Sequence, residues 1–284
     1  MQSLVDKAEV LVQALPYMRR FMGKTIVIKY GGHAMTDGPL RASFAVDVVL
    51  LKFIGLRPVV VHGGGPQIAS TLKRLGKEST FVEGLRVTDD ETMDVVERVL
   101  GEKVNPEIVE SLQQAGGRSV GLTGSDGALL RVRRKTVNGE DIGRVGEIVE
   151  VNSAVIDSLA ESNFIPVVAP IGVDDEGLTY NVNADEAAGG LASALNSEKL
   201  ILLTDVEGVM DAEGKRISQL TVEETHKYIE EEVITGGMIP KVGCCLDALE
   251  QGVGRAHIVD GRILHALLLE VFTDDAGVGT LFLR

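Results

Sequence analysis

Short apolar runs that end in glycine recur along this chain and alternate with stretches of helical periodicity. The runs include IVIKYGG (residues 26–32), PVVVHGGG (58–65), FIPVVAPIG (164–172) and KLILLTDVEG (199–208). A short apolar run bounded by turn residues is typical of a strand buried on both faces. Strands that alternate with helices predict a mostly parallel sheet with helices on both sides. We therefore expect a three-layer α-β-α sandwich of the α/β class.

The pattern divides the 284 residues into three parts. Residues 3–15 have the spacing of an amphipathic helix, and Pro16 is expected to interrupt it before the apolar face continues. This first part, residues 1–22, either packs on its own domain or pairs with another subunit. A break at Asn196 precedes the next strand, so we expect one lobe over residues 23–196 and a second over residues 197–284.

Two long segments depart from the pattern of runs and glycines. Residues 90–115 predict one long helix, closed by Gly116 and Gly117. Residues 128–151 alternate in polarity and are punctuated by glycine, which predicts β-hairpins.

Composition and charge limit the partners of the chain. The net charge is −14, which repels nucleic acid and anionic membranes, so we expect neither as a partner. The two cysteines, Cys244 and Cys245, are adjacent and cannot form an ordinary disulfide, which favours a reducing compartment. No segment approaches the ~20 apolar residues of a membrane span. We therefore expect a cytoplasmic protein.

Two glycine-rich strand ends carry the strongest chemical signal. Neither is a standard nucleotide motif: Met18 occupies the place of the first P-loop glycine, and Ile68 that of the third glycine of the dinucleotide fingerprint. However, Lys29 is separated from Gly31-Gly32 only by Tyr30, and Gly63–Gly65 opens a helix. Glycines at the carboxyl ends of strands let backbone N–H groups approach an anion, and a helix N-terminus favours one. Together they predict a site for a phosphate-bearing ligand.

Other polar residues lie in loops that can meet at the same edge of the sheet. Arg86 suits bidentate recognition of a carboxylate, although a surface arginine is an equal alternative. Asn181, Asn183 and Asp185 precede an Ala-rich helix, where they either cap the helix or orient a ligand. Lys241 begins a helix, an unfavourable place for a cation, so it is either solvated or compensated by a negative group. The five histidines show no metal-ligand spacing, and we expect no metal site built by the protein.

Six motifs in this order resemble the amino-acid kinase family, and within it the members that phosphorylate N-acetylglutamate. They are IVIKYGG, VVVHGGG, GLRVT, NVNAD, LLTDVEGVM and GGMIPKV. The resemblance runs from about Lys24 to Arg284. It implies the amino-acid kinase fold, with an acceptor-binding lobe over residues 23–196 and a nucleotide-binding lobe over residues 197–284.

The resemblance also implies roles for individual residues. The catalytic positions are Lys29, Lys241 and Asp185. The positions matched to acetylglutamate binding are Gly64, Gly65, Arg86 and Asn181. The positions matched to nucleotide binding are Gly32, Asp205, Gly208, Val209 and Met238. The expected cofactors are ATP and Mg²⁺, the ion being held mainly through the nucleotide phosphates.

The N-terminal helix and the late segment HIVDGRILHALLLEVFTDDAGVGT resemble the arginine-inhibited branch of the family. There the N-terminal helices interlace dimers into a hexamer, a trimer of dimers, and we expect the same assembly here. The candidate arginine-binding residues are Tyr17, His257, Glu270 and Gly277. Some relatives bind a nitrogen-signalling protein, which the sequence does not decide.

The expected reaction is transfer of the γ-phosphoryl group of ATP to the γ-carboxylate of N-acetyl-L-glutamate, an early step of arginine synthesis. The product would be N-acetyl-L-glutamyl 5-phosphate. One rival is a kinase for N-acetylaminoadipate, glutamate or aspartate, since one more methylene changes a site little. A second rival is a nucleotide-binding regulator without catalysis, which would not need both lysines. The failed fingerprint disfavours a third, a nicotinamide-dependent oxidoreductase.

Overall fold

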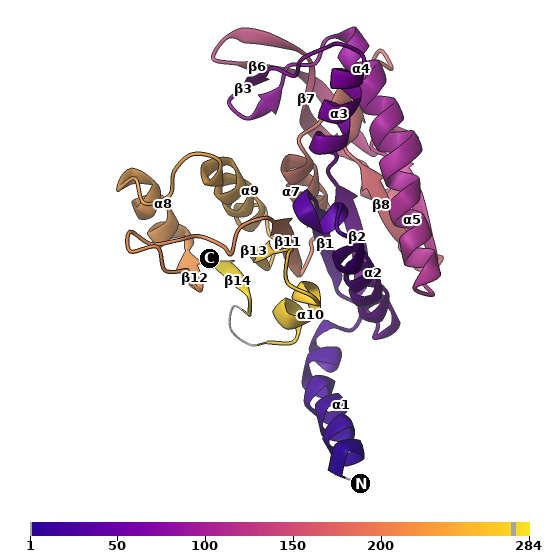
Figure 1. The fold of residues 1–284 in the computed structure, drawn as a ribbon, viewed down its shortest axis with the longest axis vertical. Coiled ribbons are helices and arrows are strands. Elements are labelled where there is room, and N and C mark those ends of the chain that lie inside the picture. Colours follow the sequence, from indigo (N-terminus) through magenta and orange to yellow (C-terminus); the bar gives the residue numbers. More distant parts are fainter. Residues whose placement is uncertain (1, 274–276) are drawn as a thin grey trace.

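An eight-stranded sheet forms the centre of the computed structural model, which describes residues 2–273 and 277–284 (Figure 1). In order across the sheet, the strands are β12 (Gln219–Thr221), β14 (Gly279–Leu283), β13 (Arg255–Asp260), β11 (Lys199–Thr204), β1 (Thr25–Tyr30), β2 (Arg57–His62), β8 (Ile165–Ala169) and β5 (Ser119–Thr123). β13 and β14 pair antiparallel, and the other neighbouring strands pair parallel. The predicted α/β class and mostly parallel sheet are confirmed.

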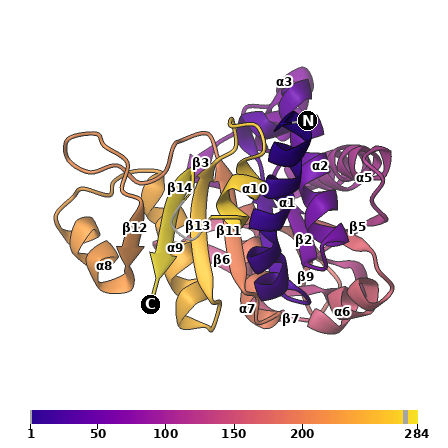
Figure 2. The ribbon, with the colours of Figure 1, turned by 90° about the horizontal axis from the view of Figure 1, so that it is seen from below.

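Helices cover both faces of this sheet (Figure 2). The α-helices of the described residues are α1 (Gln2–Phe21), α2 (Gly38–Phe53), α3 (Gly65–Arg74), α4 (Asp90–Glu97), α5 (Asn105–Gln114), α6 (Ser153–Glu161), α7 (Ala184–Ala194), α8 (Val222–Glu230), α9 (Met238–Glu250) and α10 (Ala266–Val271). Alternate strand residues enter different layers, as the strand period of two requires. In β1, Ile26 and Ile28 join the core with α2, α5 and α10, whereas Val27 joins the core with α6, α7 and α9.

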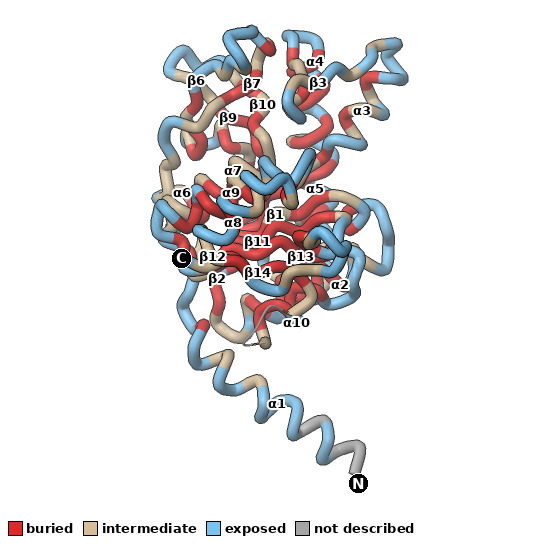
Figure 3. Tube along the Cα trace, turned by 90° about the vertical axis from the view of Figure 1, so that its left-hand side faces the viewer, coloured by how far each residue is buried: buried red, intermediate tan, exposed pale blue. Residues whose placement is uncertain are grey.

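The N-terminal helix projects from the body of the molecule (Figures 1 and 3). The expected interruption at Pro16 is wrong, because α1 runs through it to Phe21. A proline removes one backbone donor, and the helical bonds on either side of it hold this exposed helix together. Phe21 is buried in the core, but Val10, Leu11 and Val12 are 64–68% exposed. The last part of the helix therefore packs on its own chain, whereas these three residues of its middle are largely exposed.

A second, smaller β structure lies at one end of the molecule, beyond the carboxyl ends of the central strands (Figure 1). It is a closed barrel of β6 (Leu130–Val137), β7 (Glu140–Val151), β9 (Ile171–Val173) and β10 (Thr179–Asn181). The hairpin predicted over residues 128–151 is confirmed as β6 and β7. The single strand expected over residues 164–172 is wrong: Pro170, which has no N–H to donate, separates β8 in the sheet from β9 in the barrel. A short hairpin, β3 (Phe81–Val82) and β4 (Leu85–Arg86), lies beside it.

The long helix predicted over residues 90–115 is three consecutive helical pieces. A π-helical segment, Arg98–Val104, separates α4 from α5, and the Asn105 N–H donates to the carbonyl of Leu100. Pro106 lies in the first turn of α5, where its missing N–H is tolerated, and the register changes just before it. The apolar periodicity is retained through the change, which is why the sequence pattern did not reveal it.

The lobe boundary expected near Asn196 falls in the turn before β11. Because β11 pairs with β1 in the middle of the sheet, the two expected lobes share one continuous sheet. No helix within the described ranges is both long enough and apolar enough to cross a membrane.

Two glycines of the β6–β7 hairpin give a test of how the barrel packs on the rest of the chain. Gly139 (φ +81°) sits in the two-residue Asn138-Gly139 turn with open space around it, whereas Gly143 (φ +82°) lies against the Thr88 backbone, which a methyl group would overlap. Both Gly139→Ala and Gly143→Ala incur the cost of a left-handed backbone, about 1–2 kcal/mol. Only Gly143→Ala adds a backbone clash, so we expect it to lose at least about 1–3 kcal/mol more. Denaturant unfolding measures the difference, and equal losses would contradict the packing described.

Candidate active site

Three charged residues that are far apart in the sequence meet at the carboxyl end of β1. Lys29 is the penultimate residue of that strand, Asp185 is the second residue of α7, and Lys241 is in the first turn of α9. The Lys29 Nζ lies 3.0 Å from Asp185 Oδ1, and the Lys241 Nζ lies 2.6 Å from Asp185 Oδ2. The carboxylate is thus held between two ammonium groups, and its side chain is only 13% exposed. The alternative of a solvated Lys241 is wrong, since Asp185 is the negative group that compensates it.

The two lysines determine the protonation state of Asp185. Burial acts to raise the pKa of Asp185, but the charges of Lys29 and Lys241 outweigh it and leave the pKa below its ordinary value of 3.8. Asp185 is therefore ionised at neutral pH. Two ammonium groups and one carboxylate leave a net positive charge in a partly enclosed place, which is what an approaching anion requires.

The N-terminus of α7 aims Asp185 at the two lysines. Asn183 is the N-cap: its Oδ1 accepts the N–H groups of Asp185 at 2.8 Å and Glu186 at 3.2 Å. The capping alternative is therefore correct for Asn183, whereas Asp185 uses its carboxylate on the lysines. The thiol of Cys244 on α9 donates to the Asp185 carbonyl at 3.0 Å, which further ties α9 to α7.

The first glycine loop packs against the same groups. A methyl group at Gly31 would lie 2.9 Å from the Lys29 Nζ, and one at Gly32 (φ +68°) would overlap the Asp205 carboxylate. The N–H of His33 donates to Asp205 Oδ1 at 2.7 Å. Glycine is therefore required at residue 32 for two reasons, its backbone conformation and the close approach of Asp205.

The second glycine loop, Gly63–Gly65, lines a cavity of about 180 Å³. Its wall also includes Arg86, Pro170 and Asn181. Within residues 2–273 and 277–284, the N–H of Gly64 has no hydrogen-bond acceptor. Since Gly64 is also the N-cap of α3, this N–H and the positive end of the helix dipole both favour an anion in the cavity.

Arg86 is buried, so its alternative interpretation as a surface arginine is wrong. It donates to the Gly65 carbonyl at 3.1 Å and to the Ser79 hydroxyl, and its guanidinium lies 4.8 Å from the centre of the Phe81 ring. Its ordinary role in the protein is thus to hold the second glycine loop. Arg86 also lines the cavity.

Thr88 links the two candidate acceptor-binding side chains. Its hydroxyl donates to the Arg86 carbonyl at 2.8 Å and accepts from Asn181 Nδ2 at 3.2 Å. Through this one buried hydroxyl, the orientation of the Asn181 amide depends on the position of the Arg86 backbone. Thr88 is the last residue of the GLRVT motif, but nothing in the sequence indicates that its hydroxyl joins Arg86 to Asn181.

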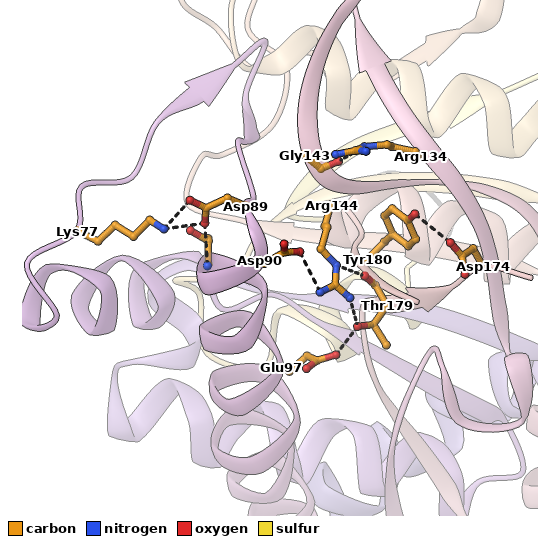
Figure 4. Close-up of polar contacts among 11 residues, drawn as sticks. Lys77, Asp89, Asp90, Glu97, Arg134, Gly143, Arg144, Asp174, Thr179 and Tyr180 are labelled. Carbon is orange, nitrogen blue, oxygen red and sulfur yellow. Dashed lines mark hydrogen bonds and ion pairs between the residues drawn. The ribbon is translucent and has the colours of Figure 1, made fainter. Parts of the chain in front are cut away.

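Arg144 holds the barrel strand that carries Asn181 (Figure 4). Its Nε donates to the Thr179 carbonyl and its Nη2 to the Thr179 hydroxyl, both at 2.9 Å, while Nη1 lies 3.4 Å from Asp90 Oδ1. The Thr179 hydroxyl in turn donates to Glu97 on α4. β10 is thereby fastened to α4, two residues before Asn181. Arg144 was also missed, since an arginine in an alternating strand looks like a solvent-facing residue.

The candidate nucleotide-binding residues are less closely grouped. Asp205 lies beside Gly32, and Met238 opens the helix that carries Lys241. Gly208 (φ +138°) and Val209 pack against β14, where the Val209 N–H donates to the Thr280 hydroxyl at 2.9 Å.

The candidate arginine-binding residues surround α10. His257 Nδ1 lies 2.6 Å from Glu270 Oε1, and Glu270 Oε2 accepts the Val278 N–H at 3.1 Å, next to Gly277. The Tyr17 ring meets the edge of Phe272 at 6.0 Å between centroids. Lys199, the first residue of the apolar strand β11, carries no motif in the sequence and donates to the Glu270 carbonyl at 3.2 Å. Burial lowers the pKa of Lys199 to about 8 and that of His257 to about 4.

The ionised state of Asp185 predicts a pH-dependent contribution to stability. Because its pKa is lower in the folded protein, the contribution is complete above the unfolded value near 3.8 and is lost as pH falls through the folded pKa. At pH 7 we expect Asp185→Asn to lower the free energy of unfolding by about 2–4 kcal/mol, since it leaves two lysines facing each other. The gap to wild type should narrow below about pH 4.

Denaturant unfolding between pH 3 and pH 7 measures this gap. Asp141→Asn is the matched control, because it removes an exposed ion pair with Arg134 and should cost less than about 1 kcal/mol at any pH. A cost for Asp185→Asn that is equal at pH 3 and pH 7 would contradict the assignment.

Comparison with solved structures gives the same fold. N-acetylglutamate synthase from Neisseria gonorrhoeae, complexed with coenzyme A and N-acetyl-glutamate, superposes with a TM-score of 0.85 at 26% identity. The match covers 96% of this chain and 62% of that one, so the chain spans less than two thirds of the synthase. The same enzyme complexed with coenzyme A and L-arginine gives a TM-score of 0.82 at 25% identity, covering 95% of this chain and 64% of that one.

Comparison of sequences gives a closer relationship. The model of the amino acid kinase family matches residues 24–260. The acetylglutamate kinase of Geobacter sulfurreducens is 58% identical over 289 aligned residues, which cover 99% of each chain. The chain therefore belongs to the amino acid kinase family, and its full-length similarity groups it with the acetylglutamate kinases.

Proposed function

We propose that the protein transfers the γ-phosphoryl group of ATP to the γ-carboxylate of N-acetyl-L-glutamate. The observation that carries this proposal is the Asp185 carboxylate clamped between Lys29 and Lys241, beside a cavity lined by backbone and side-chain donors. A relative that matches the chain over 99% of its length is named acetylglutamate kinase, which supports this proposal. In this role Lys29, Lys241 and Asp185 are the catalytic groups.

In the proposed reaction the acceptor is a small dicarboxylate that also carries an amide. We assign its recognition to the Gly64 and Gly65 backbone, Arg86 and Asn181. A γ-carboxylate has an ordinary pKa near 4.3 and is ionised at neutral pH, so no general base is required. The difficulty is instead the repulsion between a carboxylate and the γ-phosphate, which the cations reduce.

The transfer conserves atoms and charge without proton movement. A γ-carboxylate oxygen forms a bond to the γ-phosphorus, the bond from that phosphorus to the β,γ-bridging oxygen breaks, and ADP departs with the electron pair. In this proposal Lys29 and Lys241 neutralise equatorial oxygens of the phosphoryl group in transit, and Asp185, which pairs with both, holds them in position. The product is an acyl phosphate, N-acetyl-L-glutamyl 5-phosphate.

We place the nucleotide on the side of Lys29, Asp185 and Lys241 that is opposite the acceptor cavity. We assign its phosphates to the Gly32 loop and its remaining contacts to Asp205, Gly208, Val209 and Met238, so that residues 197–284 form most of the nucleotide lobe. Among the described residues, no three His, Cys, Asp or Glu side chains are grouped as metal ligands. We propose that a Mg²⁺ ion is held mainly by the phosphates, with the Asp205 carboxylate, which lies against Gly32, as a candidate protein ligand. When bound, the ion neutralises phosphate charge. The two buried free thiols suit the cytoplasm as the site of the reaction.

Trapping of the acyl phosphate with hydroxylamine tests the proposal. With ATP and Mg²⁺, we expect hydroxamate to form mainly with N-acetylglutamate, and much less with N-acetylaminoadipate, glutamate or aspartate offered in parallel. Product mainly from another acceptor would keep the mechanism and overturn the substrate. No product from any of them would overturn the enzymatic role.

Replacement of Lys29 tests the mechanism within the same assay. We expect Lys29→Ala to lower kcat by roughly 10²–10³-fold, by analogy with the loss of one oxyanion donor. Lys24→Ala is the matched control, since Lys24 precedes the same strand and makes only a partly exposed ion pair with Glu198. Near-full activity of Lys29→Ala would refute its role.

We further propose that the enzyme is a hexamer, a trimer of dimers, and that arginine inhibits it. The exposed apolar residues of α1 support an intersubunit role for that helix. The buried group around Glu270, which touches the base of α1 through Lys199 and Phe21, supports an arginine site there; the Lys199 Nζ lies 5.2 Å from the Phe21 ring centre. A solved synthase of the same fold with L-arginine is consistent with this. A nitrogen-signalling protein remains a further partner to test.

Removal of the N-terminal helix tests both ideas. We expect deletion of residues 1–22 to give a smaller oligomer by light scattering and weaker inhibition by arginine. Because the deletion also removes buried Phe21, the double variant Val10→Glu/Leu11→Glu makes the same test without disturbing the core. Gln13→Glu, on the same exposed helix, is its control. An unchanged mass for both the deletion and the double variant would overturn the proposal.

A further inference from the structure

A buried histidine and a buried asparagine that the mechanism does not use lie behind the second glycine loop. His62 is the last residue of β2, directly before Gly63–Gly65, and Asn105 is the first residue of α5. Their exposed fractions are 0% and 4%. Polar groups are buried at a cost unless they are hydrogen-bonded, so the contacts of these two side chains indicate why they are there.

The contacts fix the state of the imidazole. His62 Nδ1 lies 2.8 Å from the Gly63 carbonyl oxygen, which can only accept, so Nδ1 carries the proton. His62 Nε2 lies 3.1 Å from Asn105 Nδ2. That amide nitrogen also donates to the Val167 carbonyl at 2.9 Å, which identifies it as the NH₂ group, so Nε2 must accept. Burial lowers the pKa of His62 to about 4, and the ring is therefore neutral at physiological pH.

The bond from His62 determines which way the loop presents its donors. In a trans peptide the C=O and the following N–H point in opposite directions. Holding the Gly63 carbonyl toward His62 in the core therefore turns the Gly64 N–H to the opposite side. Gly64 lines the cavity, and its N–H has no acceptor in the described part of the chain. The Gly63 N–H donates to the Tyr30 carbonyl at 2.8 Å. Both backbone groups of Gly63, its N–H and its carbonyl, are therefore hydrogen-bonded.

The π-helical segment explains how Asn105 reaches His62. Its wider turn brings residues five apart onto one face, and the Asn105 N–H donates to the Leu100 carbonyl. Leu100 packs so closely on Gly64 that a methyl group there would overlap it, while the Asn105 Oδ1 lies against Gly121 in the same way. One irregular helix thus braces the loop at two places, through an apolar contact and through the imidazole.

We infer that His62 and Asn105 are positioning residues, which hold the Gly63–Gly64 peptide so that its N–H points at the acyl acceptor. The inference rests on the proposed function to the extent that the acceptor occupies the cavity. Neither side chain touches the substrate. Asn105 selects the Nδ1–H tautomer, and that tautomer orients the peptide.

Two substitutions of His62 separate positioning from a merely structural role. An asparagine amide can replace a donor at the place of Nδ1, whereas the longer glutamine amide reaches the place of Nε2. We expect His62→Asn to keep the KM for N-acetylglutamate within about threefold, and His62→Gln to raise it roughly tenfold or more, the effect of losing one aligned donor. The KM for ATP should change little in either variant.

Ser119→Ala is the matched control for destabilisation, because it removes a buried hydrogen bond from Ser119 to the Val109 carbonyl on α5 without touching the glycine loop. It should lower the melting temperature and leave the KM for N-acetylglutamate unchanged. Equal KM values for His62→Asn and His62→Gln, alongside lowered melting temperatures, would overturn the inference.

Nitrogen NMR of the ¹⁵N-histidine-labelled wild-type enzyme provides a readout that needs neither variant to fold. We expect His62 as the neutral Nδ1–H tautomer, and the Nε2–H tautomer would overturn the inference. The wild-type hydroxamate assay separates failure of this inference from failure of the proposed function. If the wild-type enzyme forms no hydroxamate, the proposed function is refuted. If it forms hydroxamate but His62 is the Nε2–H tautomer, only the role of His62 is refuted.

Discussion

The Asp185 carboxylate holds together parts of the chain that only the fold brings near each other. Lys29 comes from the first strand of the sheet and Lys241 from a helix more than 200 residues later, and each makes an ion pair of 3.0 Å or less with the same carboxylate. Two ammonium groups this close repel each other, and the anion between them makes the arrangement stable. The net positive charge that remains is local, in a chain whose total charge is −14. An anionic substrate is therefore attracted by the site itself rather than by the protein as a whole.

The cavity and the trio of Lys29, Asp185 and Lys241 present different kinds of donors. Toward the cavity, neutral groups dominate: the Gly64 N–H and the Asn181 amide, with Arg86 partly engaged by the Gly65 carbonyl. These groups suit recognition by shape and hydrogen bonding, and they are held by Thr88, Arg144 and, as we infer, His62. Around the trio itself, full charges dominate, which suits stabilisation of a phosphoryl group in transit. The separation follows from the parallel sheet, which directs both glycine-rich strand ends, β1 and β2, to the same edge.

The sequence predicted the parts of the site that depend on strand ends. Lys29 and both glycine loops could be located because apolar runs and glycines mark the carboxyl ends of parallel strands. The negative group expected near Lys241 is Asp185, although nothing in the spacing of residues 185 and 241 shows that they meet. The burial of Arg86, the role of Arg144 and the barrel around β10 depend on tertiary packing with no local signature. The π-helical turn before Asn105 was hidden because the apolar pattern continues through it.

The central claim is that Lys29, Asp185 and Lys241 act as one unit on the transferred phosphoryl group. A double-mutant cycle on kcat for N-acetylglutamate, with Lys29→Ala and Asp185→Asn singly and combined, tests it most directly. If Asp185 acts by holding the lysines, the double variant should lose no more than about threefold beyond the worse single variant. Losses that multiply in the double variant would mean that the two residues act independently, and would contradict the account.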